Sequence, residues 1–102
     1  MLRIYGVAVR MLEELRVPIE AIEQKDRDLG RQMRRAATSV VLNLAEGTGS
    51  SGGTRRERYR NALGSVREVQ GCLDAAQALG YVEPVPVEGM REVTGSLVKL
   101  TR

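Results

Sequence analysis

Hydrophobic residues recur every three or four positions over most of the 102-residue chain, which is the pattern of amphipathic α-helices. The first stretch keeps this spacing with Ile4, Val7, Ala8, Met11, Leu12 and Leu15. Pro18 interrupts it, because proline lacks the amide hydrogen of a helix interior. Ile19 and Ile22 continue the apolar side to about Gln24. The pattern leaves two alternatives open, one long helix kinked at Pro18 or two short helices.

A second helix is predicted from about Asp26 or Asp28 to Glu46, with Gly47 as a natural C-terminal stop. Its apolar residues fall within about 140° of a helical wheel, and they are Leu29, Met33, Ala36, Ala37, Val40, Val41 and Leu44. The opposite side of this helix carries Arg27, Arg31, Arg34 and Arg35. The segment is therefore strongly amphipathic.

The third helix is expected after a flexible loop at residues 47–53, with Thr54–Glu57 matching the capping-box pattern of a helix start. One side of it carries Tyr59, Ala62, Leu63, Val66, Val69, Leu73, Ala76 and Gly80. A second side holds mostly small residues, namely Gly64, Ser65, Cys72, Ala75 and Leu79. A helix with two such sides is expected to pack against more than one neighbour, another subunit included.

Residues 83–86, with two prolines, form a stiff connector, because the residue before a proline avoids the α conformation. A fourth, shorter helix then follows the spacing of Val87, Met90, Val93, Leu97 and Leu100. The expected fold class is all-α, an antiparallel up-and-down four-helix bundle. Residues 1–102 are expected to form this bundle as a single domain.

Composition narrows the possible functions. The chain has no histidine, which removes the commonest general base and the commonest transition-metal ligand, and it has a single cysteine. We therefore expect no enzyme activity, no cofactor and no metal site. No apolar run is long enough to span a membrane and no signal peptide is apparent, so a cytoplasmic location is expected. Cys72 is expected to be a small buried side chain, since nothing nearby would acidify its thiol.

Residues 47–52 match the G-x-G-x-x-G pattern of dinucleotide-binding loops. That motif requires a preceding strand, whereas residues 42–46 are predicted to be helical. A plain loop between helices is the favoured interpretation. The following helix start, with Arg55 and Arg56, remains a place where a backbone phosphate could bind.

Polar residues lie on one flank of the second helix and one flank of the third: Ser39, Asn43 and Glu46, and Ser65 and Glu68. If the two helices are antiparallel neighbours, these side chains meet. A carboxylate-bridged metal site would need histidines that the chain lacks. The expected result is a hydrogen-bonded seam that fixes the register of the helices, with Glu46 or Glu68 paired to an arginine.

Charge is concentrated in residues 25–60, where nine basic residues face four acidic ones, while the whole chain has a net charge of only +3. Arginine, which suits bidentate phosphate contacts, outnumbers lysine fourteen to two. These properties favour binding of RNA or DNA through phosphates, and the few aromatic residues disfavour base stacking. The candidate residues are Arg27, Arg31, Arg34, Arg35, Arg55, Arg56, Arg58 and Arg60. The alternative is a solvated helix surface with partial ion pairing.

Four sequence segments resemble a known family, over nearly the whole chain from the first helix to Gly80-Tyr81. They are residues 34–39 (RRAATS), residues 43–47 (NLAEG), residues 62–65 (ALGS) with Glu68, and residues 79–81 (LGY). The family consists of bacterial four-helix bundles named after proteins encoded in intervening sequences of large-subunit ribosomal RNA genes. The accessory variability determinant of diversity-generating retroelements belongs to it.

The resemblance implies a four-helix bundle, a ring-like homopentamer and a basic surface. For the retroelement branch it also implies binding to nucleic acid and to a reverse transcriptase. Asn43, Glu46, Ser65 and Glu68 match as signature positions of the bundle, with no catalytic role. The main hypothesis is a non-catalytic, nucleic-acid-binding oligomer. The alternative is a protein-interaction scaffold that uses the small-residue side of the third helix.

Overall fold

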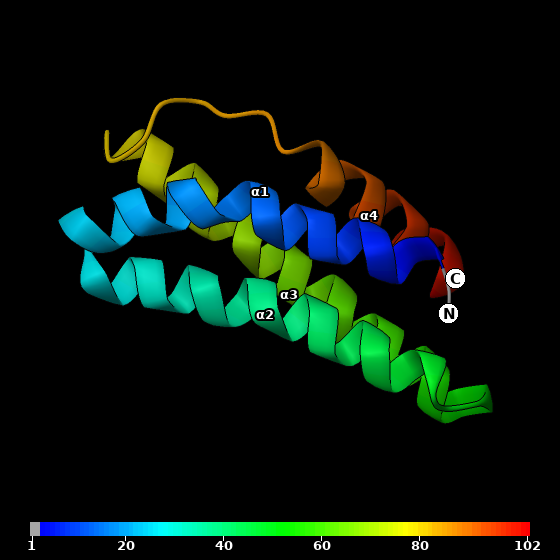
Figure 1. The fold of residues 1–102 in the computed structure, drawn as a ribbon. Helices are drawn as coiled ribbons and strands as arrows, with labels where there is room; N and C mark the ends of the chain where they lie inside the picture. Colours follow the sequence, from blue (N-terminus) through cyan, green and yellow to red (C-terminus); the bar gives the residue numbers. More distant parts are fainter. Residues whose placement is uncertain (1–2) are drawn as a thin grey trace.

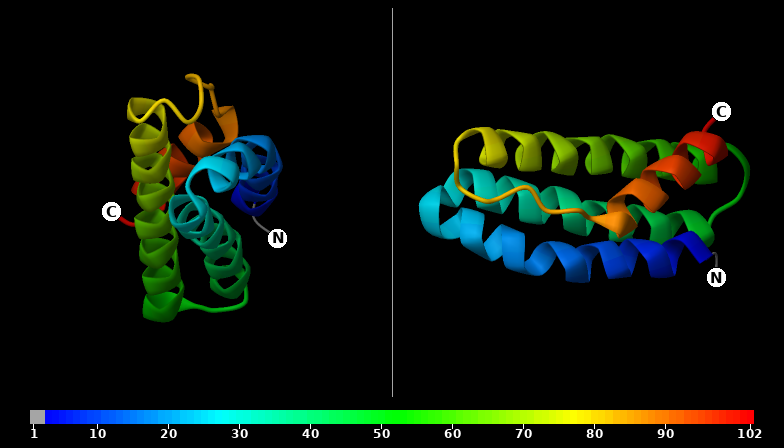
Figure 2. Two further views of the ribbon diagram at one scale, coloured as in Figure 1. Left: turned by 90° about the vertical axis from the view of Figure 1, so that its left-hand side faces the viewer. Right: turned by 90° about the horizontal axis from the view of Figure 1, so that it is seen from above.

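The computed structural model describes residues 3–102, which form four α-helices. They are α1 (Arg3–Lys25), α2 (Arg27–Thr48), α3 (Gly52–Ala78) and α4 (Glu88–Leu100). Residues 3–102 contain no β-strand, so the all-α class with four helices is confirmed. In Figure 1 α2 runs back along α1 and α3 runs back along α2, whereas α4 crosses the bundle obliquely (Figure 2).

The core lies between the four helices and is almost entirely aliphatic. α2 packs against α1 and α3, and α4 packs against the same two helices. The largest side chains without solvent contact include Met11, Leu15, Ile22, Met33 and Leu44. Among the described residues, no polar or charged residue is buried. Apolar burial therefore supplies most of the favourable free energy of folding.

Pro18 lies inside α1, which is one continuous helix. This settles the open question of the first segment. A proline removes one hydrogen bond, here the one that the Glu14 carbonyl would accept. The Pro18 ring is buried with Leu15, Ile19 and Ile22, so its apolar contacts offset part of that loss.

α1 and α2 form a tight antiparallel pair joined through the single residue Asp26. The Asp26 carboxylate accepts a hydrogen bond from the Leu29 amide at 3.1 Å, which caps α2. Gly30 then lies against α1, because a Cβ at this position would be only 2.7 Å from the Cα of Glu23. Because Gly30 has no side chain, α1 and α2 can lie in contact directly after the one-residue turn.

The prediction that Gly47 ends the second helix is wrong. α2 continues to Thr48, and Gly49 takes the C-terminal position. Gly47 is buried against the ring of Tyr59, where a Cβ would lie 2.5 Å from the ring carbon Cε1. Glycine is thus required here by an aromatic ring on α3 rather than by the helix end.

The predicted capping box at Thr54 is also wrong. α3 begins at Gly52, with Ser51 before it, so Thr54 and Glu57 lie within the first turns of the helix. The connection from α2 shrinks to residues 49–51, and Arg55 fastens it. The Arg55 guanidinium donates to the Ser50 carbonyl at 2.6 and 2.9 Å and to the Gly47 carbonyl at 3.2 Å. These bonds satisfy one carbonyl in the last turn of α2 and one in the connection.

α4 is held to α1 at its first turn. The connector from α3 runs back along the bundle before α4 begins (Figure 2). Val87 precedes α4 and gives no side-chain cap, but the Gly89 amide donates to the Glu14 carboxylate of α1 at 2.9 Å. A Cβ at Gly89 would lie 2.9 Å from the Cα of Met11. Gly89 therefore permits the closest approach of α4 to α1.

Candidate nucleic-acid interface

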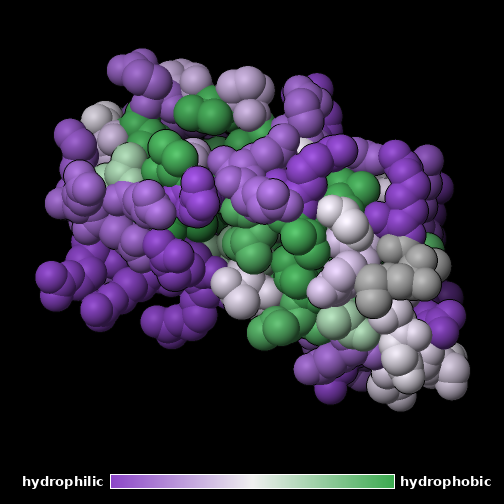
Figure 3. Space-filling model, viewed as in Figure 1, coloured by the Kyte–Doolittle hydropathy of each residue, from purple (hydrophilic) through white to green (hydrophobic). Residues whose placement is uncertain are grey.

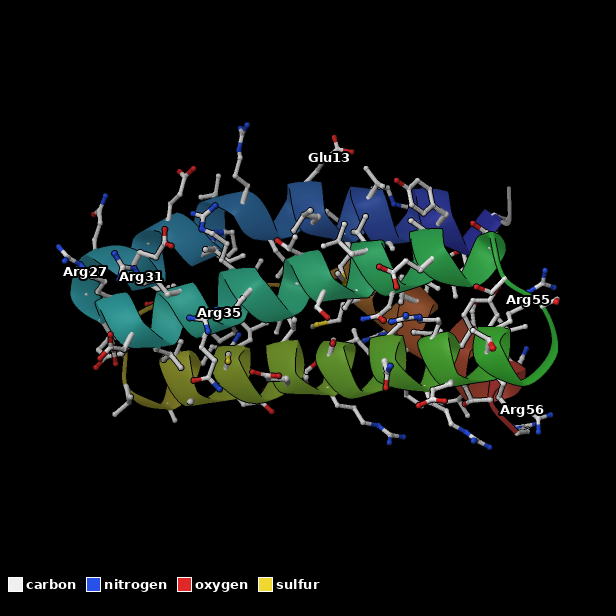
Figure 4. All side chains as sticks on the ribbon, turned by 90° about the horizontal axis from the view of Figure 1, so that it is seen from below. Glu13, Arg27, Arg31, Arg35, Arg55 and Arg56 are labelled. Carbon is white, nitrogen blue, oxygen red and sulfur yellow. The ribbon has the colours of Figure 1, made fainter. Side chains whose placement is uncertain are left out.

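Three of the eight candidate arginines form a row on the first half of α2. Arg27, Arg31 and Arg35 are four residues apart, so they lie on one side of the helix, and all three are exposed. Figure 4 shows Arg27 and Arg31 at the end of the bundle where α1 meets α2. Within residues 3–102, none of the three has a carboxylate within ion-pair distance. Their guanidinium groups are therefore free to contact a ligand.

Arg34 stands apart from this row because it binds Glu23 of α1. Its guanidinium donates two hydrogen bonds to the two carboxylate oxygens of Glu23, at 2.7 and 2.9 Å. The hydrogen bonds from Arg34 lower the pKa of Glu23 below its usual value, and the positive charge of Arg34 adds to the effect. Arg34 thus joins α1 to α2, and Glu23 largely neutralises the positive charge of its guanidinium group.

The α3 arginines also divide into bound and free. Arg55 is held by the carbonyls of the α2–α3 connection, and Arg58 forms an ion pair of 2.9 Å with Glu46. Arg56 and Arg60 are exposed, with no ion pair in the described part of the chain. Arg67 lies on the same side of α3, at a spacing of seven from Arg60, and is exposed as well.

The eight arginines do not form one surface. Figure 4 shows Arg55 and Arg56 at the opposite end of the bundle from Arg27 and Arg31. Arg27 is the first residue of α2 and Arg55 and Arg56 follow its end, so the length of α2, about 33 Å at 1.5 Å per residue, separates the outermost arginines of the two groups. The sequence suggested a single basic segment, whereas the fold creates two basic ends.

The polar seam joins α2 to α3 at three levels. In the middle, the Ser65 hydroxyl donates to the Ser39 hydroxyl at 2.9 Å. The Asn43 amide donates to both the carbonyl and the hydroxyl of Ser39 at 3.0 Å. Further levels are the Glu46–Arg58 ion pair and, at the other end, a hydrogen bond of 3.3 Å from the Gln32 amide to Glu68.

These contacts fix the register of the two helices, because each of them joins a residue of α2 to a residue of α3 at about the same level of the bundle. The seam is partly exposed, and its residues are engaged with one another. Its geometry suits a structural role and offers no nucleophile paired with a base.

Cys72 is buried on α3 next to this seam. Burial raises the pKa of its thiol, and the negative charge of Glu68 raises it further. A raised pKa keeps the thiol protonated and poorly reactive at neutral pH. In residues 3–102 no three Cys, Asp or Glu side chains gather as a metal site would require. No helix in this range is long and apolar enough to cross a bilayer.

The model of a protein family described as 23S rRNA-intervening sequence protein matches residues 2–101. The chain belongs to this family. The match spans all four helices, so membership concerns the whole bundle. No curated protein and no solved structure matches the chain.

The polar seam coincides with the sequence segments by which the chain resembles the intervening-sequence proteins. The segments that carry the sequence resemblance contain Ser39, Asn43, Glu46, Ser65 and Glu68. In the structure these residues lie along the α2–α3 contact, together with Gly47, against which Tyr59 packs. The recognisable motif of this chain is therefore the contact between α2 and α3.

Proposed function

We propose that this intervening-sequence protein is a non-catalytic, oligomeric four-helix bundle of the antiparallel up-and-down type that binds RNA through phosphate contacts in the cytoplasm. The observation that supports this proposal most directly is a set of exposed arginines without an acidic partner in the described residues, namely Arg27, Arg31, Arg35, Arg56 and Arg60. Arginine without a partner in the chain binds phosphate oxygens without the cost of breaking an ion pair. The family description, which refers to 23S rRNA, favours RNA over DNA.

The two basic ends support contacts to a backbone at separate points. The outermost arginines of the two ends are about 33 Å apart, which is the length of α2 and exceeds the reach of any single side chain. The exposed surface near them lacks aromatic rings: Tyr59 is buried, and Tyr5 and Tyr81 are half-buried against the core. Recognition by base stacking therefore has no platform here, which favours backbone contacts.

Salt dependence of binding tests the proposal. A fluorescent RNA duplex and a single strand of equal length are titrated with the protein between about 50 and 200 mM salt. The triple variant Arg27→Gln, Arg31→Gln, Arg35→Gln removes three phosphate contacts. The slope of log affinity against log salt is then expected to become shallower by about two to three units, since each contact contributes about 0.7 to 0.9.

A second triple variant, Arg10→Gln, Arg16→Gln, Arg91→Gln, is the control. It lowers the net charge by the same amount through exposed arginines of α1 and α4. Its slope is expected to stay within one unit of the wild-type slope. An equal decrease of the slope in both variants would show that the effect depends only on net charge. Absence of RNA binding at low salt would contradict the proposed function.

The alternative of a protein-interaction scaffold is supported by the exposed glycines of α3, Gly64 and Gly71. Under that alternative, the arginine variants leave partner binding unchanged, while Gly64→Leu disrupts assembly.

A reverse transcriptase is the partner that we propose if the gene lies in a diversity-generating retroelement. A reverse-transcriptase gene and a variable repeat next to this gene, followed by co-purification of the two proteins, test that extension.

A further inference from the structure

A polar hollow lies between α2 and α3, near the end of the bundle where α1 meets α2. Its volume is about 370 Å³, within the range of sites that hold small ligands. We call it the α2–α3 polar hollow, and it is lined by Asp28, Arg31, Gln32, Arg35 and Glu68. Spacings of three and four residues place its α2 members on one side of that helix. Figure 4 shows Arg31 and Arg35 along this part of α2, and Figure 3 shows that hydrophilic residues cover this end of the molecule.

The charges of this hollow cancel, yet its charged groups are not paired with one another. Two guanidinium groups, from Arg31 and Arg35, stand beside two carboxylates, from Asp28 and Glu68. No ion pair in the described residues involves any of these four side chains. A phosphate inside the hollow would meet the carboxylates, and a metal ion would meet the guanidinium groups. The hollow therefore suits a neutral group that carries both hydrogen-bond donors and acceptors.

Glu68 is held as an acceptor on the α3 side of the hollow. The Gln32 amide of α2 donates to its Oε2 at 3.3 Å, and within residues 3–102 its Oε1 accepts no hydrogen bond. Arg35 supplies donors from the α2 side, since a guanidinium has five N–H groups in a planar fork. The hollow thus offers acceptors from one helix and donors from the other. A ligand that uses both groups fully needs a pair of adjacent donors and a pair of adjacent acceptors.

Among the RNA bases, guanine has this arrangement. Its N1–H and its N2 amino group are adjacent donors that suit a carboxylate. Its O6 and N7 are adjacent acceptors, and this pair is the commonest base-specific partner of arginine. Adenine carries a donor amino group in place of O6, and cytosine carries a single donor group beside its acceptors. A base pair would cover N1 and N2, so only an unpaired guanine can reach the carboxylate.

We propose that the α2–α3 polar hollow binds the base of an unpaired guanosine in RNA. The N1 and N2 groups donate to the Glu68 carboxylate, and O6 and N7 accept from the Arg35 guanidinium. Arg27 lies about two turns before Arg35 on α2 and is exposed, so it binds a phosphate of the same strand. Arg35 itself contacts both the base and a neighbouring phosphate, because the N–H groups that do not serve the base stay free. This proposal rests on the RNA binding proposed above and adds a base preference to it.

The base is varied first, which leaves the protein unchanged. Fluorescent oligouridines with one central guanosine, inosine, adenosine or cytidine are titrated with the wild-type protein at low salt. The guanosine RNA is expected to bind at least about fivefold more tightly than the adenosine and cytidine RNAs, as one bidentate contact gives. Inosine lacks the N2 amino group, so the inosine RNA is expected to bind about threefold less tightly than the guanosine RNA, because one hydrogen bond to Glu68 is lost.

Two protein variants then test the two walls of the hollow, each with a matched control. Glu68→Gln is expected to bring the affinities for guanosine and inosine RNA within about twofold of each other. Glu57→Gln, which changes an exposed acid of α3 outside the hollow, is expected to keep their difference. Arg35→Gln is expected to abolish the preference for guanosine over adenosine, because glutamine matches N6 and N7 of adenine. Arg27→Gln removes the same charge and is expected to weaken the binding of all four RNAs by the same factor.

The outcomes separate this site from the proposed function. If none of the RNAs binds at low salt, both are overturned. If all four bind with equal affinity, or if the guanosine preference survives both Glu68→Gln and Arg35→Gln, the guanine site alone is overturned and phosphate binding stands. Tighter binding of the cytidine RNA would contradict guanine as the recognised base. Circular dichroism checks that each variant is folded, and if one is not, the comparison of guanosine with inosine on the wild type still decides whether the N2 amino group is recognised.

Discussion

At several glycines of this protein, neighbouring atoms leave no room for even a single Cβ atom. Gly30, Gly47 and Gly89 each lie where a Cβ would come within 3 Å of a neighbouring helix or ring. From the sequence, Gly47 looked like a helix end, and no local pattern required glycine at position 89. The reasons for both lie on other helices, at Tyr59 and Met11, and local sequence patterns cannot reveal them.

Gly47→Ala is expected to lower the free energy of unfolding. The added methyl group would collide with the ring of Tyr59, and overpacking of this kind costs about 1 to 3 kcal/mol. Urea denaturation followed by circular dichroism measures the change. Gly95→Ala is the control, because that site is open and helical, and it is expected to stabilise the protein by up to about 1 kcal/mol. Equal stability of the two variants would contradict the assigned role of Gly47.

At the scale of helices, periodicity located all four segments, and the Asp26 start of α2 agrees with the prediction. The start of α3 was misplaced because the α2–α3 connection depends on Arg55 rather than on a capping threonine. The two basic ends could not be predicted either. Arg35 and Arg55 are close in sequence, but the intervening part of α2 carries them apart.

The Glu23–Arg34 pair predicts how stability depends on pH. The pKa of Glu23 is lowered in the folded protein. Between the folded and unfolded pKa values, the unfolded chain therefore binds more protons, so stability rises with pH in that range. The contribution of the pair is complete above the usual value of 4.5 and is lost as the pH falls through the lower folded pKa.

Glu23→Gln is accordingly expected to be less stable than the wild type at pH 7, with the difference shrinking as the pH falls below 4.5. Thermal melts of both proteins from pH 7 to pH 3 measure this convergence. Glu83→Gln, an exposed acid of the α3–α4 connection outside the ion pairs of the described residues, is the control. A constant difference across the pH range would show that Glu23 acts by packing rather than by charge.

For the whole molecule, the helix pattern and an aliphatic composition were enough to predict a four-helix fold. The binding surface could not be predicted from the sequence, because arginines in similar sequence surroundings have different partners in the structure. Arg34, Arg55 and Arg58 contribute to the fold, whereas Arg27, Arg31 and Arg35 have no acidic partner in the described residues. Replacing arginines of the second kind, to which Arg56 and Arg60 also belong, is predicted to change nucleic-acid affinity without changing stability.

The attachment of α4 through Gly89 and Glu14 has a kinetic consequence. These residues are 75 positions apart in the chain, whereas α1, α2 and α3 are linked by connections of one to three residues. α4 also spans only 13 residues against the 27 of α3. Its detachment leaves the three-helix remainder connected, so α4 is expected to open as a separate unit while the rest stays folded.

Native-state hydrogen exchange measures this opening. Amides of α4 are expected to exchange at lower free energy than those of α2, and Glu14→Gln is expected to speed the exchange of α4 alone, by a few-fold to about tenfold for the weakened cap. Uniform exchange across all helices would mean that the bundle opens only as a whole. Reversible release of α4 would uncover Met11 of α1 and Met90 of α4 and so expose apolar side chains that the closed bundle buries.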